Sequence, residues 1–503
     1  MKKFAKLFVI TTFLGLAFPA WIMSQNFNIN LNTNQNGLFV LSKSNTALTL
    51  KNSISSVQLN AKQKSGNNYN HLLIEGYNSN KQNIGKADLP VYNKLLEIPH
   101  GANVNVTIVS YDEETVYLLS EGINNQLYPV QPSYSKSTDP ADIIFQYDEN
   151  YYSTDQFSTE PLAKIEEVGY MRETRIGRLS ISPFSYNPVK RELKVYNNMI
   201  IEISFENADI ALSNAKKSKA YSPFFEKFNS MLLNYSPNPA KDQITTYPIK
   251  YIIVANRMFE TQLQPFIQWK TRKGFNVITG YTDQANVGTT TTTIKAFIKS
   301  FYDNATPSDP APTFVLLVGD VAQIPTFTGT TNSAHKTDLK YFEYTGDYLP
   351  EIYYGRWSAT STAQLQPQID KTMMYEQYTM PDPSYLKNIL LVAGVDQEGG
   401  DPNGFSTVHG NGQLLYGINN YFNAAHGLSN YEYLYPESDL PASVAAIKAD
   451  FNTGVAYANY TAHCSSTGWA NPSFTTSDVP NMTNANKYGL MVGNCCQSNT
   501  FND

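Results

Sequence analysis

The chain has 503 residues, of which 42% are hydrophobic and 16% are charged; this length exceeds that of a usual single domain, and the apolar content argues against a disordered protein. The net charge is −6 and no long block of Lys or Arg occurs, which argues against nucleic acid or an anionic membrane surface as a partner. We therefore expect at least two folded domains with the composition of a β-rich extracellular protein.

Residues 1–24 have the pattern of a secretory signal peptide. Lysines among the first six residues precede an apolar run over residues 7–23, and polar sequence begins at Ser24. The alternative is an uncleaved transmembrane anchor, but the run is short for a bilayer span and lies at the extreme N-terminus. We predict cleavage near Ala20 or Ser24. Because no second run of spanning length follows, we expect a secreted or cell-surface protein without a membrane span.

Residues 25–208 alternate apolar and polar side chains with a period of two and contain little helical periodicity. We predict an all-β domain, a sandwich, over this range. Within it, residues 193–205 are predicted to form a hairpin that turns at Asn197 and Asn198. Residues 209–249 are predicted to be a connector that is cut during maturation, because their lysine-rich and Pro/Asn-rich stretches suit an exposed segment.

From residue 250 the pattern changes to short apolar strands that alternate with helices. Such βαβ units predict a doubly wound, mostly parallel sheet that is covered by helices on both faces. The predicted strands are residues 251–255, 275–279, 314–318, 389–393, 455–460 and 490–492, and the predicted helices include residues 258–273, 294–301, 362–378 and 443–451.

The three cysteines, Cys464, Cys495 and Cys496, all lie in the last 40 residues. Adjacent Cα atoms are about 3.8 Å apart, so Cys495 and Cys496 cannot easily bridge each other. An exported protein held by disulfides would spread an even number of cysteines along its chain. We therefore interpret these cysteines as reactive thiols more than as a disulfide scaffold. Their spacing to histidines does not indicate a structural zinc site.

Asp396, His463 and Cys496 each come shortly after one of the predicted strands, and catalytic groups in such sheets collect beyond the carboxyl ends of the strands. A thiolate is a nucleophile, and a nearby imidazole both lowers the thiol pKa and protonates a leaving amine. A carboxylate can fix the imidazole tautomer. Each residue alone would also fit ordinary packing or a loop. Their shared place at one rim predicts a cysteine nucleophile with a histidine base.

Several short runs carry a family resemblance that covers the chain from its β-rich half to its last residue. They resemble the gingipains (peptidase family C25), which are secreted cysteine endopeptidases, and within that family the lysine-specific branch. The resemblance implies a caspase-like α/β peptidase domain over residues 250–503, incomplete at its C-terminus, and an inhibitory propeptide before it. The runs are residues 460–463 (YTAH), 493–496 (GNCC), 266–274 (FIQWKTRKG), 318–320 (VGD), 346–351 (GDYLPE) and 458–469 (ANYTAHCSSTGW).

The same resemblance implies roles for individual site residues. Cys496 corresponds to the nucleophile and His463 to its base. The third catalytic member falls on Asp396, with Glu398 as the alternative. The family's glycine after the histidine is Cys464 in this chain. A Cβ at that position is expected to crowd the oxyanion hole, whose donors would be backbone N–H groups near it and at the nucleophile.

The resemblance also bears on specificity and partners. Thr461 matches a residue that lines the substrate pocket of the lysine-specific branch, and residues 406–408 lack the aspartate of arginine-specific members. We expect cleavage of protein or peptide substrates after a basic residue, lysine more than arginine. The implied partners are the propeptide as an intramolecular inhibitor and, for the full-length form, the type IX secretion machinery. The alternatives are a non-enzymatic surface or secretion component and an adhesin built on the β-rich half.

A calcium site is implied in the loop around residues 345–351. Asp347, Leu349 and Glu351 alternate carboxylate, carbonyl and carboxylate around a turn, and such hard oxygen ligands suit Ca²⁺. From the residues alone, a solvated acidic turn is an equal alternative. The resemblance adds Asp320 and the carbonyl of Thr345 to the ligands of a structural calcium ion, and it implies no organic cofactor.

Overall fold

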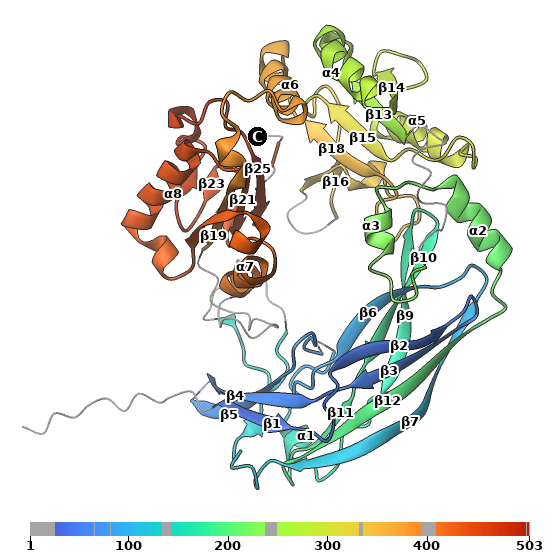
Figure 1. The fold of residues 1–503 in the computed structure, drawn as a ribbon, viewed down its shortest axis with the longest axis vertical. Coiled ribbons are helices and arrows are strands. Elements are labelled where there is room, and N and C mark those ends of the chain that lie inside the picture. Colours follow the sequence, from blue (N-terminus) through green and yellow to red (C-terminus); the bar gives the residue numbers. More distant parts are fainter. Residues whose placement is uncertain are drawn as a thin grey trace, which may run out of the picture.

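The structure is a computed structural model that describes residues 26–64, 66–80, 82–132, 142–236, 249–330, 335–394, 409–498 and 500–501. The N-terminal half is all-β, and the C-terminal half consists of parallel sheets with flanking helices, so the predicted fold class is confirmed (Figure 1). The predicted signal peptide lies outside the described residues. In the part of the chain that is described, no helix combines the length and the apolar character needed to cross a membrane.

Three sheets, paired mostly antiparallel, build the β domain and enclose two clusters of buried apolar side chains. The first sheet orders its strands β1 (Asn26–Asn30), β4 (Ser56–Lys64), β5 (Asn67–Leu73) and β8 (Gln126–Leu127). The second orders β11 (Phe184–Asn187), β12 (Glu192–Glu206), β3 (Ala47–Ser53) and β2 (Gly37–Lys43), with β7 (Asn103–Tyr117) also paired to β12. The third orders β6 (Tyr92–Glu97), β10 (Thr174–Ile181) and β9 (Ala163–Met171), and the helix α1 is Glu149–Ser153.

The hairpin predicted at Asn197 and Asn198 is wrong, because both residues lie inside the single strand β12. This strand pairs with β7 on both sides of the two asparagines, and the register shifts between Asn197 and Ile200. Asn198 has a φ of +47°. The Asn197 side chain accepts a hydrogen bond from the Ile54 N–H at 2.9 Å and donates one to the Ile54 carbonyl at 2.8 Å. The pair therefore forms a bulge that bends the strand rather than a turn that reverses it.

The segment predicted to be a connector contains two packed helices, α2 (Ile210–Lys219) and α3 (Glu226–Asn229). Asp209 caps α2 by accepting a hydrogen bond from the Leu212 N–H at 2.8 Å. Phe225 and Leu232 are buried, so residues 209–236 are held against the rest of the molecule. The remainder of the predicted connector, residues 237–248, lies outside the described residues.

The first α/β unit is a four-stranded parallel sheet with a buried core on each face. Alternate residues of its central strands point to opposite faces: Ile252 and Val254 pack toward α5, while Ile253 and Ala255 pack toward α4 and α6. The strand order is β14 (Phe275–Tyr281), β13 (Ile249–Ala255), β15 (Phe314–Val318) and β18 (Tyr353–Trp357), and the helices are α4 (Glu260–Arg272), α5 (Thr291–Asp303) and α6 (Thr362–Gln377). A two-stranded ribbon, β16 (Phe327–Thr328) and β17 (Lys336–Thr337), is attached.

The second α/β unit repeats the same strand order in a separate parallel sheet, whereas the sequence pattern predicted a single sheet. Leu390 and Val392 face α8, and Ile389 and Leu391 face α7. The switch point of this sheet lies between β19 and β21, and ligands of such sheets bind beyond the strand ends there. The order is β20 (Ser429–Tyr433), β19 (Asn388–Ala393), β21 (Tyr457–Thr461) and β25 (Leu490–Asn494), with α7 (His409–Asn420), α8 (Pro441–Thr453) and a small sheet of β22 (Cys464–Ser465), β23 (Gly468–Trp469) and β24 (Phe474–Thr475).

Candidate active site

The carboxyl ends of β21 and β25 carry the two side chains predicted to do the chemistry. Thr461 pairs with Asn494 in the parallel ladder, and each is the last residue of its strand. His463 lies two residues after Thr461, and Cys496 lies two residues after Asn494. The two residues are therefore equally far along the chain from the last paired residues of the ladder. The neighbouring strand β19 ends here too, because Ala393 pairs with Thr461. The structure thus places the histidine and the cysteine at one rim.

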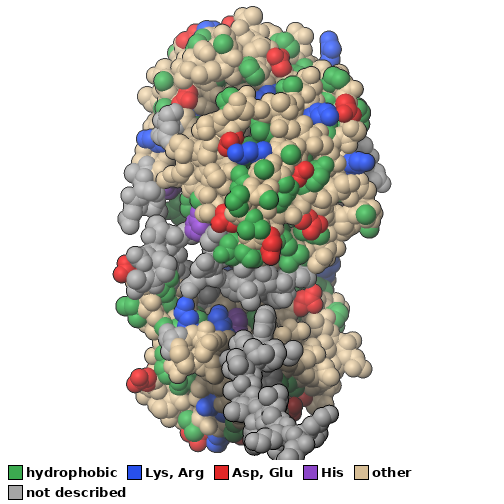
Figure 2. Space-filling model, turned by 90° about the vertical axis from the view of Figure 1, so that its left-hand side faces the viewer, with side chains coloured by type: hydrophobic (Ala, Val, Ile, Leu, Met, Phe, Trp, Pro, Cys, Tyr) green, Lys and Arg blue, Asp and Glu red, His purple; other side chains and the backbone are tan. Residues whose placement is uncertain are grey.

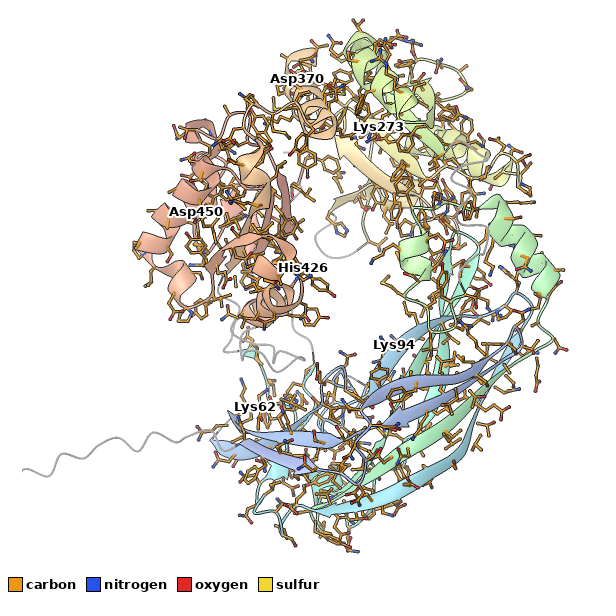
Figure 3. All side chains as sticks on the ribbon, in the orientation of Figure 1. Lys62, Lys94, Lys273, Asp370, His426 and Asp450 are labelled. Atoms are coloured by element: carbon orange, nitrogen blue, oxygen red, sulfur yellow. A yellow bond between two sulfur atoms is a disulfide. The ribbon has the colours of Figure 1, made fainter. Side chains whose placement is uncertain are left out.

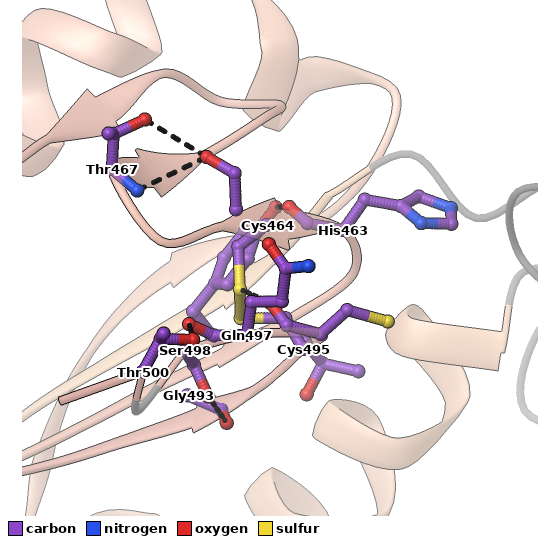
Figure 4. Close-up of a disulfide and its surroundings, with 12 residues drawn as sticks. His463, Cys464, Thr467, Gly493, Cys495, Gln497, Ser498 and Thr500 are labelled. Carbon is purple, nitrogen blue, oxygen red and sulfur yellow. Dashed lines mark hydrogen bonds between the residues drawn. A yellow bond between two sulfur atoms is a disulfide. The ribbon is translucent and has the colours of Figure 1, made fainter. Parts of the chain in front are cut away.

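Buried aromatic packing anchors the backbone of His463. The Tyr460 hydroxyl donates a hydrogen bond to the His463 carbonyl at 2.7 Å, and the Ala470 N–H donates to the same oxygen at 2.9 Å. The Tyr460 ring is fully buried and stacks on Trp469, with 4.2 Å between ring centroids. Burial raises the pKa of Tyr460 to about 12, so its hydroxyl stays a donor at neutral pH. The imidazole points away from this anchor (Figure 4).

Cys496 is an exposed free thiol in a tight turn after β25. The next residue, Gln497, has a φ of +57°, a left-handed conformation that costs a non-glycine residue about 1 kcal/mol. The Ser498 hydroxyl closes the turn by donating to the Gly493 carbonyl at 3.0 Å. Gly493 leaves room for this contact, since a Cβ there would lie 3.0 Å from the Ser498 Cβ and press the side chain aside. The turn holds the thiol outside the sheet, where a substrate can reach it.

The interpretation of all three cysteines as reactive thiols is wrong for two of them, because Cys464 and Cys495 form a disulfide (Figure 4). Their Cα atoms are 5.5 Å apart and 31 residues separate them in sequence. The Cys464 sulfur also lies 2.7 Å from the carbonyl oxygen of Cys496. The bond joins the residue that follows His463 to the residue that follows the neighbouring parallel strand β25.

Of the residues predicted for the third catalytic role and the substrate pocket, the structure describes only Thr461. Asp396 and its alternative Glu398 lie outside the described residues, as do residues 406–408. The last described residue before them, Gly394, donates its N–H to the Thr461 carbonyl at 3.0 Å. Thr461 itself is only 1% exposed, and its hydroxyl donates to the Asn459 side-chain oxygen at 3.1 Å.

Two predicted calcium ligands lie together in the first α/β unit. The Thr345 hydroxyl donates to Asp347 at 2.7 Å and to Glu351 at 3.2 Å, so both carboxylates approach one group. Burial raises the pKa of Glu351 to about 7. The loop also orients its own backbone, because the Leu349 N–H donates to the other Asp347 oxygen at 2.8 Å. The two carboxylates are hard oxygen donors of the kind that suits Ca²⁺, and with the predicted carbonyls of Thr345 and Leu349 they would make an oxygen-only set.

Asp320 is engaged elsewhere. Its carboxylate accepts hydrogen bonds from the Ser358 hydroxyl at 2.7 Å and from the Val321 N–H at 2.5 Å, at the end of β15. Among the described residues, no three His, Cys, Asp or Glu side chains are grouped as a metal site. The fit to calcium therefore rests on Asp347, Glu351 and the two loop carbonyls, which would supply a structural cation with half of its usual ligands.

The β domain inserts one hairpin, β9–β10, into the first α/β unit. Arg172 at its tip is 4% exposed, and its guanidinium donates to the carbonyls of Ala220, Pro312 and Glu351 at 2.8, 2.6 and 3.0 Å. The guanidinium also lies over the Phe225 ring, 4.6 Å from its centroid. A buried cation so fully paired fixes the two domains against each other.

The same hairpin touches the predicted calcium loop. The Tyr170 N–H donates to Asp347 at 2.6 Å. Gly169, with a φ of +150°, allows this approach, because a Cβ there would overlap the Asp347 carboxylate. Sequence reasoning missed these contacts, since an arginine and a glycine in a strand-rich segment have no local pattern that marks a contact between domains. Arg172 and Glu173 form the turn between β9 and β10, which the sequence pattern did not single out.

Comparison with known proteins places this geometry in a family. Residues 244–503 match the model described as peptidase family C25, and residues 39–235 match its propeptide model, Propeptide_C25. Lys-gingipain W83 of Porphyromonas gingivalis is 39% identical over 419 residues, which are 83% of this chain and 23% of that protein. Gingipain R1 of the same species is 24% identical over 428 residues, which are 85% of this chain and 41% of that protein.

A solved structure described as "Structure of Protease" has 39% sequence identity and a TM-score of 0.46, and the match covers 53% of this chain and 57% of that one. The chain spans about a quarter of the length of the Lys-gingipains that it matches, with 23% of one and 24% of another covered.

Proposed function

The chain belongs to peptidase family C25, and we propose that it is the precursor of a secreted cysteine endopeptidase with Cys496 as nucleophile and His463 as base. One observation carries the proposal: both residues follow adjacent parallel strands at the same distance beyond the ladder pair of Thr461 and Asn494. Cys496 is also an exposed free thiol. A thiol and an imidazole on neighbouring strand ends are what acyl transfer to cysteine requires.

The proposed reaction passes through an acyl-enzyme. His463 takes the thiol proton of Cys496, and the thiolate forms a C–S bond with the scissile carbonyl carbon. Backbone N–H groups at Cys496 and near Cys464 stabilise the oxyanion. The C–N bond breaks as the imidazolium gives its proton to the leaving amine. Water, deprotonated by the same imidazole, then hydrolyses the thioester. Asp396 is proposed to hold the imidazole tautomer by accepting from its second N–H.

The β domain is proposed to keep the peptidase latent until it is removed. It matches the family propeptide, and the buried guanidinium of Arg172 supports a tight association with the first α/β unit. The proposed cut lies within residues 209–249, and of these residues 237–248 link the last described part of the β domain to β13. N-terminal sequencing of the secreted mature enzyme should therefore begin after residue 209.

Substrate preference is proposed to be for lysine before the scissile bond. Residues 406–408 lack a carboxylate that could pair with a guanidinium, and an arginine without a bidentate partner is poorly satisfied in a pocket. Chromogenic peptides that differ only in Lys, Arg or an apolar residue at that position measure the preference. A preference for Arg or an apolar residue above about tenfold, equal to roughly 1.4 kcal/mol, contradicts it.

The proposed setting is extracellular. Residues 1–24 supply the proposed signal for export, and the type IX machinery is proposed to take the full-length form to the surface. The face that Figure 2 shows carries Lys/Arg and Asp/Glu side chains interspersed, without a block of one sign. That distribution supports protein substrates in solution more than a polyanion as the partner.

Two substitutions in the full-length protein test the proposal. Cys496→Ala should remove peptide hydrolysis and labelling by a peptidyl ketone, because no other thiol is placed to attack. His463→Ala should lower kcat by about two to four orders of magnitude through loss of the base. His426→Ala is the matched control, since this exposed histidine sits on a short helix after α7 (Figure 3). A Cys496→Ala protein that still hydrolyses substrate would show that Cys496 is not the nucleophile, whereas a wild-type protein that neither hydrolyses peptides nor takes the label would support a surface or secretion component instead.

A further inference from the structure

We propose that the Cys464–Cys495 disulfide positions the catalytic pair, so that the peptidase is fully active only while this bond is closed. The proposal rests on the proposed roles of His463 and Cys496. Each bonded cysteine is the sequence neighbour of one catalytic residue: Cys464 follows the histidine and Cys495 precedes the nucleophile. The bond therefore joins the two chain segments at the exact place where both leave the sheet.

Each of these two segments makes its other hydrogen bonds with its own strand or with the residues that follow it. The His463 carbonyl is held by Tyr460 of β21 and by Ala470 of the following loop. The turn after β25 is closed by the bond from Ser498 to Gly493, within that turn. Among the described residues, no hydrogen bond or ion pair joins residues 463–470 to residues 495–498. The cross-links between them are the disulfide and the contact of its Cys464 sulfur with the Cys496 carbonyl.

Beyond the ladder, the direct link between the segments that carry the thiol and the imidazole is therefore the disulfide, with the sulfur–carbonyl contact beside it. Below it, the ladder of β21 and β25 ends at Thr461 and Asn494. Beyond the ladder, the His463 side chain projects from a loop (Figure 4), and Cys496 lies in the turn after β25. Both cysteines pack against the buried cluster that contains Trp469, so the cross-link has a fixed base. A displacement of about 1 Å between reacting groups can cost a large factor in rate.

Two opposite redox requirements follow from this arrangement. The nucleophile works as a thiol, so a reagent that strips an oxidised cap from the exposed Cys496 activates the enzyme. A strong dithiol does more: it opens the Cys464–Cys495 bond to two thiols while it is itself oxidised to a cyclic disulfide. Activity should therefore rise with a weak monothiol and fall again as dithiothreitol opens the half-buried bond. A peptidase without a positioning disulfide would show only the rise.

The bond itself is tested by alkylation of the full-length protein. Unfolding in iodoacetamide without a reductant, followed by peptide mapping, should label Cys496 and leave Cys464 and Cys495 joined in one cross-linked pair of peptides. After reduction all three should be labelled. Labelling of all three without a reductant, or a bridge from Cys464 to Cys496, would overturn the proposal.

The positioning role is tested by the double variant Cys464→Ser/Cys495→Ser, with Cys464→Gly/Cys495→Ala to restore the family glycine. Both should lower kcat about tenfold with KM within twofold, and both should lose the inhibition by dithiothreitol. In the wild-type protein, Cys496 should be alkylated even at low pH, because the imidazolium stabilises its thiolate. In the double variants this reaction at low pH should be lost. A cross-link that only stabilises the fold would change the melting temperature and leave this pH profile unchanged.

The outcomes separate this inference from the proposed function. If Cys496→Ala is inactive while the double variants keep the wild-type kcat and alkylation profile, the positioning role is wrong and the peptidase assignment stands. If Cys496→Ala is active, both are wrong. If the double variants fail to fold, the wild-type protein is titrated with dithiothreitol. Activity that falls at concentrations that leave the melting temperature unchanged supports the positioning role. Activity that stays constant while the bond opens refutes it.

Discussion

Arg172 is a single side chain on which the association of the two halves depends. Burial lowers its pKa to about 10, so the guanidinium is still charged at neutral pH and must be satisfied inside the protein. Backbone carbonyls and the Phe225 ring do this. The tip that presents it is strained, since Arg172 and Glu173 have φ values of +46° and +65°. Positive φ at both residues of a two-residue loop is the geometry of a tight β-hairpin turn, and this turn places the Arg172 side chain at the contact between the domains.

Arg172→Ala should release the propeptide early. Loss of the charged hydrogen bonds removes about 2 to 4 kcal/mol from the association and leaves buried carbonyls unpaired. The precursor should hydrolyse peptides before it is cleaved, whereas the wild-type precursor should stay latent. Arg178→Ala is the control, because Arg178 lies on β10 of the same hairpin and pairs with Glu166 at the exposed surface. Equal latency of both variants would show that the hairpin does not hold the inhibitor in place.

At the scale of elements, the α4–α6 contact is held by one carboxylate. Glu376 on α6 accepts hydrogen bonds from Trp269, Lys270 and Lys273 of α4 at 2.9, 2.6 and 3.2 Å. Burial alone would raise its pKa, but the hydrogen bonds and charges of the lysines outweigh it, so the pKa of Glu376 is lowered. Lys270 is itself buried, and it depends on this partner.

Glu376→Gln should destabilise the fold by about 1 to 3 kcal/mol near pH 7, because it leaves the Lys270 ammonium without its counter-charge. A carboxyl whose folded pKa is depressed stabilises the protein above its unfolded pKa and loses that contribution as the pH falls through the folded pKa. The difference in melting temperature between wild type and variant should thus shrink in acid. Asp370→Asn, on the exposed side of α6, is the control (Figure 3). A difference that is constant with pH would contradict the ion pair.

The elements of the α/β half were predictable and some of those in the β half were not. The predicted strand at residues 251–255 corresponds to β13, because a β-branched run buried on both faces can only be an interior strand. The bulge at Asn197 was missed since its local sequence favours a turn, while pairing of β12 with the distant β7 decides the outcome. The ends of the predicted strands were enough to predict that His463 and Cys496 lie at one rim of the sheet. The disulfide depended on the register between β21 and β25, which no local pattern reveals.

At the scale of the whole molecule, the two α/β units share one strand order but carry different sites. The second unit carries the rim with Cys496 and His463. The first unit carries the docking site of the propeptide hairpin and the proposed calcium loop, which meet at Asp347. The hairpin of the proposed inhibitor and the loop that is proposed to bind the metal therefore meet on the same unit, which is not the one that carries the proposed nucleophile.

Removal of calcium should destabilise the protein through that loop. A cation that binds only the folded state stabilises it by mass action, by about 2.7 kcal/mol at a hundredfold excess over Kd. EGTA should therefore lower the melting temperature, and excess calcium should restore it. Asp347→Asn should remove this response, because the variant loses one of the two carboxylates that share the Thr345 hydroxyl.

Asp303→Asn serves as the control in that experiment, because this exposed carboxylate pairs with Lys299 outside the loop and its loss should leave the response to calcium intact. The propeptide adds a second expectation. Tyr170 donates to the same carboxylate, so the mature enzyme, freed of this hydrogen bond, should bind calcium more tightly than the precursor in isothermal titration. Identical melting of wild type and Asp347→Asn with and without calcium would contradict the site. Equal affinity of precursor and mature enzyme would show that the hairpin and the cation do not share Asp347.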